Sequence, residues 1–109
     1  MWVFTETGFI SAVMHHDDEN IIIVRAREPQ SLDGIAALAD AKIVSTPVRD
    51  YPWRVHVTRA IFQQWLASAA EDLRYTNYKS RIHETRGDEF YSTLSHVWEV
   101  MHEVEERCN

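Results

Sequence analysis

Short apolar runs separated by turn-forming residues make up the first part of the chain. Glu6-Thr7-Gly8 separates the first two runs, and the polar stretch 16–20 separates the second from the third. Such runs predict strands over residues 1–5, 9–15 and 21–27. In the third run Ile22, Val24 and Ala26 alternate with the side chains of the other face, so we expect those three to point into a core.

The middle of the chain changes between a helical and a strand pattern. Pro29 suits the first turn of a helix, which a short strand over 42–45 follows. Residues 51–57 alternate, with Trp53, Val55 and Val57 facing inward. Thr58 is suited to cap a helix over 59–73. The apolar stripe of that helix is Phe62, Trp65, Leu66, Ala69 and Leu73.

The last part of the chain carries a narrow stripe of apolar residues, which we call the seam. It consists of Phe90, Leu94, Val97, Met101, Val104 and Cys108. Steps of four and three residues predict an amphipathic helix that begins at Asp88. Residues 75–87 are polar and aromatic, and their pattern neither indicates nor excludes a helix. We expect the seam to pack on the helix over 59–73 within one chain. The alternative is a homodimer through Phe90, Leu94, Val97, Met101 and Val104.

The order of these elements is β-β-β-α-β-β-α-α, which predicts the α+β class. We expect an antiparallel or mixed sheet of about five strands covered by helices, with a partly ferredoxin-like βαββ segment. No repeat or flexible linker divides the chain. The sequence therefore predicts a single compact domain over residues 1–109.

Charge and composition narrow the functional classes. The net charge of −6 disfavours non-specific binding to nucleic acid. The single cysteine, Cys108, excludes an internal disulfide and a thiolate-rich zinc site. No leader pattern and no apolar run long enough to span a bilayer are present. We therefore expect a soluble, cytoplasmic protein that makes no use of a membrane.

The most unusual segment lies in the basic stretch that precedes the acidic last helix. Residues 75–83 interleave tyrosines with cations, a mixture that suits stacking on a base while a cation meets a phosphate. The same mixture suits a protein interface, and a linker packed on the core is a third interpretation. Trp98, at the edge of the seam, is expected to stay partly exposed. The candidate binding residues are Tyr75, Asn77, Tyr78, Lys79, Arg81 and Trp98.

Other clusters give weaker indications of chemistry. His15, His16, Asp17 and Asp18 lie at a turn, where polar residues are ordinary. Neighbouring strand residues also point to opposite faces, which separates the two histidines. On the last helix His96, Glu99 and Glu103 share a face, but a bundle metal site needs matching ligands from other helices. We therefore expect no metal, no cofactor and no catalytic residue.

Several strings of residues resemble a family of small proteins from bacteria, particularly actinobacteria, and from their phages. The less specific strings are Met1-Trp2-Val3-Phe4 and Asp50-Tyr51-Pro52-Trp53-Arg54. The more specific ones are Tyr75-Thr76-Asn77-Tyr78-Lys79 and Val97-Trp98-Glu99-Val100-Met101. The resemblance covers nearly the whole chain. No activity is established for that family, so the resemblance implies a fold unit without a mechanism.

Three functions remain open at this stage. The first is a small non-enzymatic protein that binds and regulates another protein, a host protein if the chain is encoded by a phage. The second is nucleic-acid binding through residues 75–81. The third is a small hydrolase-like enzyme in which His83 or His96 acts with carboxylates in acid–base chemistry.

Overall fold

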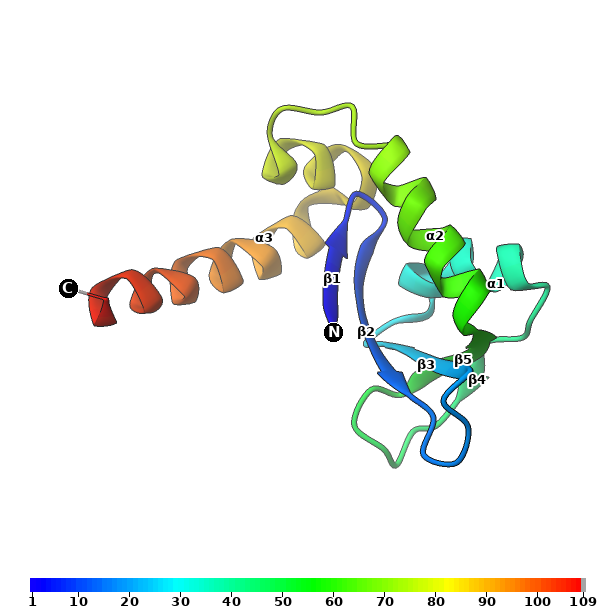
Figure 1. Cartoon of the computed structure of the whole chain (residues 1–109). Coiled ribbons are helices and arrows are strands. Elements are labelled where there is room, and N and C mark those ends of the chain that lie inside the picture. Colours follow the sequence, from blue (N-terminus) through cyan, green and yellow to red (C-terminus); the bar gives the residue numbers. More distant parts are fainter. Residues whose placement is uncertain (109) are drawn as a thin grey trace. The chain divides into compact units, whose positions relative to one another are not determined.

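Three strands at the start of the chain form an antiparallel meander in the computed structural model, which describes residues 1–108. They are β1 (Trp2–Thr5), β2 (Gly8–Met14) and β3 (Ile21–Ala26). β1 pairs with β2 and β2 pairs with β3, both antiparallel. The three predicted strands are thus confirmed, with ends that differ by at most one residue (Figure 1).

A helical crossover connects β3 to the strand at the far edge of the sheet. The chain passes through the 3₁₀ helix η1 (Pro29–Leu32) and α1 (Asp33–Ala39), then through β4 (Val44–Ser45) and β5 (Trp53–Thr58). The strand order is β1-β2-β3-β5-β4. Because β3 and β4 both run antiparallel to β5, they are parallel to each other and flank β5. This is the βαββ arrangement of a half ferredoxin-like sheet, preceded here by the β1–β2 hairpin.

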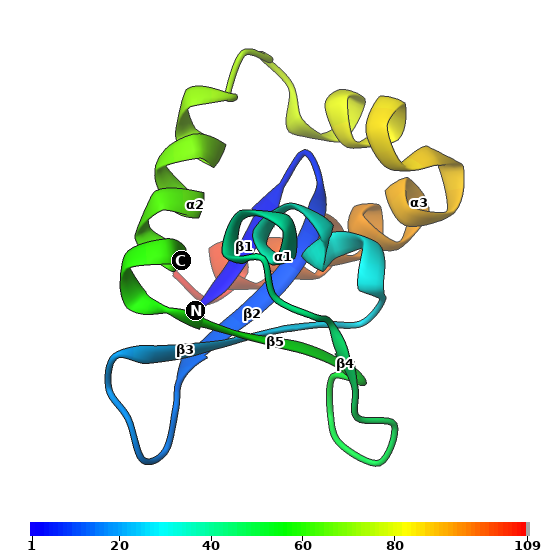
Figure 2. The ribbon, with the colours of Figure 1, turned by 90° about the vertical axis from the view of Figure 1, so that its right-hand side faces the viewer.

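One face of this sheet carries the core. Alternate residues of β2, β3 and β5 point to that face, including Val24 and Val55, which are almost completely buried. Leu32 and Ile35 cover them from η1 and α1, and Phe62 and Trp65 from α2 (Arg59–Glu71). Figures 1 and 2 show α1 and α2 on the same side of the sheet. The predicted α+β class and antiparallel sheet are therefore confirmed.

The helix α2 begins as predicted but ends earlier. The Thr58 hydroxyl accepts a hydrogen bond from the Ile61 backbone N–H at 3.2 Å, which caps the first turn. The helix ends at Glu71, so Leu73 lies beyond it and its side chain is 61% exposed. The prediction that Leu73 belongs to the buried stripe is wrong, because the helical period no longer applies past Glu71.

Close contacts divide the chain into two compact units. The first is Met1–Arg74, and the second begins at Tyr75. The second unit consists of α3 (Tyr78–Arg107), in which Gly87 has φ 87° and ψ −177° and interrupts the helix. The segments before and after Gly87 run in different directions, as the yellow and orange parts of α3 show (Figures 1 and 2). A single domain over the whole chain stays a prediction.

The two segments of α3 account for the part of the sequence whose pattern was undecided. The helix predicted from Asp88 is the segment that follows Gly87, and residues 78–86 form the segment that precedes it. Within residues 1–108, no helix has both the length and the apolar character that crossing a membrane requires.

Candidate interaction surface on the C-terminal helix

Asn77, one of the predicted binding residues, starts α3. Its side-chain oxygen accepts a hydrogen bond from the Ser80 backbone N–H at 2.9 Å, so it is the N-cap of the helix. An amide placed in this way satisfies one of the backbone donors that a helix start leaves unpaired. Asn77 therefore has a structural task that explains its position without a ligand.

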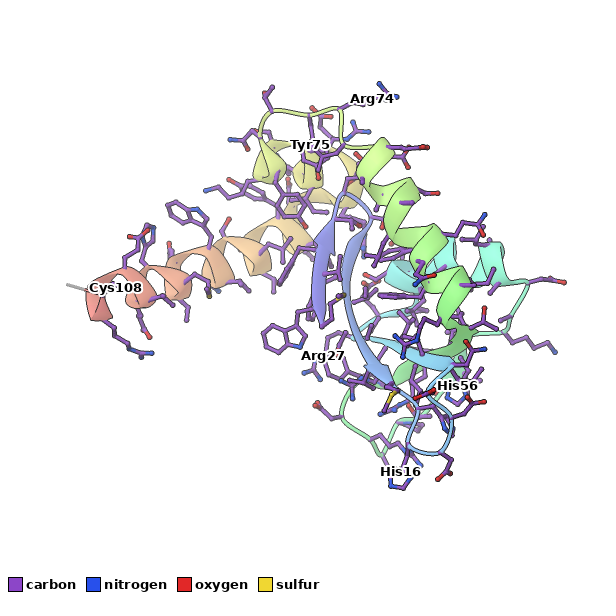
Figure 3. The ribbon with its side chains drawn as sticks, in the orientation of Figure 1. His16, Arg27, His56, Arg74, Tyr75 and Cys108 are labelled. Carbon is purple, nitrogen blue, oxygen red and sulfur yellow. The ribbon has the colours of Figure 1, made fainter. Side chains whose placement is uncertain are left out.

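The two tyrosines of the segment contact each other. The Tyr75 and Tyr78 rings lie 6.2 Å apart between centroids, and both side chains are half-buried. Burial raises the pKa of the Tyr78 hydroxyl above its ordinary value, and the neighbouring Tyr75 adds to the shift. Figure 3 marks Tyr75 in the segment that precedes α3 and Cys108 at the far end of the helix.

Lys79 and Trp98 come together although 18 residues separate them in the sequence. The Lys79 Nζ atom lies 3.9 Å from the centroid of the Trp98 ring, which is a cation–π contact. The break at Gly87 turns the second segment of α3 back toward the first, which makes this contact within the unit possible. Two residues that the sequence singled out separately therefore belong to one surface.

Trp98 also contacts the following turn of the helix. The Trp98 and His102 rings meet edge to face with centroids 4.5 Å apart, and a hydrogen bond of 3.0 Å joins His102 Nδ1 and Glu105 Oε2. Lys79, Trp98, His102 and Glu105 thus form a continuous row of contacts. Half of the Trp98 side chain, 52%, stays exposed, as the sequence predicted.

Beside this row lies an exposed apolar face of α3. Spacings of three and four residues place its members on one side of the helix. Of the predicted seam, Leu94 is buried, whereas the later members are at least one-third exposed. We call the following residues the α3 face: Val97, Trp98, Val100, Met101 and Val104.

Carboxylates occupy the opposite side of the same helix. Glu99, Glu103 and Glu106 follow one another at steps of four and three, so they share a face that the apolar residues leave free. Between Val97 and Arg107 there are four glutamates against a single arginine, a net charge of −3. The apolar α3 face therefore lies on a helix segment that carries a net negative charge.

Arg81 and the candidate acid–base residues His83 and His96 lie elsewhere in the second unit. Arg81 Nη1 lies 3.2 Å from Glu84 Oε2. His83 forms a short hydrogen bond with Asp88, and its ring lies 4.7 Å from that of Tyr91. His96 is exposed on the polar side of the helix. Arg81 and the two histidines are thus not brought onto the α3 face.

The turn between β2 and β3 holds the other cluster considered from the sequence. His16 Nδ1 lies 2.9 Å from Asp17 Oδ1, and the Asp17 backbone N–H donates to His15 Nδ1 at 3.0 Å. These are local contacts of a polar turn. Among residues 1–108, no group of three or more histidine, cysteine, aspartate or glutamate side chains is arranged to hold a metal ion.

Two residues of this surface were not identified from the sequence. Val100 lies outside the seam because it falls three residues after Val97 and one before Met101, yet it is 59% exposed beside them. His102 was not among the candidate binding residues, whereas it contacts Trp98 and Glu105. A wider apolar stripe, counted over steps of three and four from Val97, would have found Val100.

The chain was compared with protein-family models, with curated proteins and with solved structures, and none of the three comparisons found a match.

Proposed function

We propose that the protein binds another protein through the α3 face, without catalysing a reaction. The observation that supports this is the exposure of five large apolar side chains in two successive turns of one helix. Contiguous apolar surface that remains exposed is typical of sites where another macromolecule docks. Trp98 and Met101 are of residue types that are enriched at such interfaces.

The partner that fits this face presents an apolar helix flanked by lysines or arginines. An apolar helix face is most readily covered by a second amphipathic helix. The glutamates of α3 attract cations and repel carboxylates, which selects a basic partner. A second copy of the chain is the poorer match, because it would place two segments of net charge −3 side by side.

The nucleic-acid alternative is not favoured by the geometry of residues 75–81. Tyr78 is half-buried against Tyr75, and Lys79 lies on the Trp98 ring. Stacking on a base and contacting a phosphate would require both side chains to leave these positions. The identity of the partner, including its origin in a host cell, stays a prediction.

Affinity capture from a cell lysate, with and without nuclease, identifies the partner, and titration with the purified partner then gives the affinity. The test variant is Met101→Glu, which places a carboxylate in the α3 face. The matched control is His96→Glu, which adds the same charge on the polar side of the same helix. We expect Met101→Glu to weaken binding at least about tenfold, because the partner would cover the new carboxylate and remove its hydration.

The control variant distinguishes a specific effect at the α3 face from a general effect of the added negative charge. Binding that Met101→Glu and His96→Glu weaken equally would contradict a specific role of the α3 face. Capture that nuclease abolishes would favour nucleic acid instead. A molecular mass in solution twice that of the chain, lost in Met101→Glu, would show that the occupant is a second copy.

A further inference from the structure

A pocket of about 660 Å³ lies on the face of the sheet opposite α1 and α2. Ile23 pairs with His56 and Val44 pairs with Arg54, and all four side chains line this pocket from the exposed face of β3, β4 and β5. The β2–β3 and β4–β5 connections border it, and both project from the lower edge of the sheet in Figures 1 and 2. Figure 3 marks His16 and His56 at that end of the unit.

The pocket gathers three cations from separate places in the sequence: Lys42, Arg49 and Arg54. Lys42 comes from the stretch before β4, Arg49 from the β4–β5 connection and Arg54 from β5. Within residues 1–108, the side chains of Lys42 and Arg49 form no hydrogen bond or ion pair. Both therefore remain available to an anion.

Arg54 is the most constrained of the three cations. Its Nη2 donates to the Asp50 backbone oxygen at 3.2 Å, whereas its Nε is buried and has no hydrogen-bond partner within residues 1–108. Burial lowers the pKa of the Arg54 guanidinium, and the positive charges of Arg25 and Arg49 lower it further. A buried donor beside like charges is stabilised by an anion that accepts a hydrogen bond.

The neighbouring carboxylates compensate these cations only in part, because Asp50 raises the pKa of Arg54 by less than burial, Arg25 and Arg49 lower it. Asp50 is hydrogen-bonded at 2.8 Å to Arg27, which lowers the pKa of the Asp50 carboxyl. The acid on the pocket wall is Asp17, and its carboxylate faces His16 at 2.9 Å. Three cations thus face a single carboxylate that is already engaged, which leaves an excess of positive charge in the pocket.

An apolar wall lies beside the cations. Ile23 and Val44 contribute aliphatic surface, and the His15 and His56 rings meet edge to face with centroids 5.7 Å apart. The volume is within the range of pockets that hold small organic ligands and is far larger than a free phosphate ion requires. The pocket therefore offers space for an organic group next to a charged group.

We propose that this pocket binds a small phosphate monoester, with its phosphate group on Lys42, Arg49 and Arg54 and its organic group against Ile23 and Val44. A phosphate dianion matches the excess charge better than a carboxylate, and guanidinium groups recognise phosphate with paired hydrogen bonds. A long polyanion is a poorer match, because Asp18 and Glu19 follow the wall residue Asp17 in the β2–β3 connection and would repel it. This site lies wholly within the first unit and is independent of the α3 face.

The test is a titration of the ¹⁵N-labelled full-length protein with phenyl phosphate, followed by amide chemical shifts. We expect saturable shifts at Ile23, Thr46 and Arg54, and weaker binding of inorganic phosphate, which lacks the organic group. Arg49→Gln should raise the dissociation constant about tenfold, since it removes one charged hydrogen-bond donor. Arg74→Gln is the matched control, because Arg74 is exposed, carries the same charge and does not line the pocket.

Three outcomes would overturn the proposal. The first is the absence of saturable shifts at the pocket residues up to millimolar phenyl phosphate. The second is an equal loss of affinity in Arg49→Gln and Arg74→Gln, which would show a general charge effect. The third is equal affinity for phenyl phosphate and inorganic phosphate, which would exclude a role of the apolar wall. Failure of this test leaves the proposed function of the α3 face unaffected.

Discussion

Tyr78 has a half-buried hydroxyl near the start of α3, and this burial raises its pKa above 10.0. A raised pKa means that the unfolded chain ionises first as the pH increases. The stability that the neutral Tyr78 contributes is therefore complete below pH 10 and is lost as the pH rises further. We expect the free energy of unfolding to fall by about 1 kcal/mol between pH 8 and pH 11 on account of this residue.

Urea denaturation followed by helical circular dichroism at both pH values measures this effect. Tyr78→Phe should reduce the fall by that amount, because the ionisable hydroxyl is gone. Tyr91→Phe, a change of the same kind in the same helix, is the control. An equal pH dependence in wild type and Tyr78→Phe would show that Tyr78 is not responsible.

At the scale of elements, Gly87 determines the course of α3. Its φ of 87° with ψ of −177° lies in a region that side chains disfavour, although a Cβ atom there would meet no atom within 4 Å. Backbone strain alone therefore decides the effect of a substitution. We expect Gly87→Ala to lower the free energy of unfolding by about 1–2 kcal/mol and to weaken the contact between Lys79 and Trp98.

Gly34→Ala in α1 is the matched control for the same measurement by urea denaturation. Gly34 is helical, and a Cβ atom there would lie at an ordinary contact distance of 3.7 Å from Trp65 Nε1. We expect Gly34→Ala to raise the free energy of unfolding by about 0.5–1 kcal/mol, since alanine favours the helix. A Gly87→Ala protein as stable as wild type would indicate that the break does not depend on glycine.

At the scale of the whole molecule, the buried cluster under α1 and α2 lies entirely within Met1–Arg74. Its residues extend from Ile10 to Trp65, and the partly buried residues packed on it extend from Val3 to Leu66. A fragment of residues 1–74 therefore contains every residue of this cluster, and we expect it to keep the sheet and the core. We expect it to unfold cooperatively on heating and to give the amide spectrum of the same residues in the full chain.

The same experiment tests the predicted single domain. A fragment that has no cooperative transition would show that the first unit requires the residues that follow Arg74. Its amide spectrum separates this outcome from aggregation, because an unfolded fragment gives narrow, poorly dispersed signals. The full-length protein, measured under the same conditions, provides the reference.

The strands and α2 could be predicted because their signals are local. Ile22, Val24 and Ala26 alternate along one strand, and Thr58 caps the helix that follows it, as the structure confirms. The candidate surface was predicted in part. Trp98 was expected to stay partly exposed and does, whereas the sequence did not reveal that Asn77 caps α3 or that the Tyr78 ring is half-buried. The role of these residues in binding stays a prediction. Residue type alone does not reveal a cap or a buried ring.

The α+β class and the positions of most elements could be inferred from the sequence alone, because hydrophobic periods, caps and turns act over a few residues. Which distant residues meet depends on the folded chain. The break at Gly87 brings Lys79 onto Trp98, and the pairing of β4 with β5 places Lys42, Arg49 and Arg54 around one pocket. These contacts depend on chain direction and strand pairing, which are set by the packing of the folded chain and leave no period in the sequence.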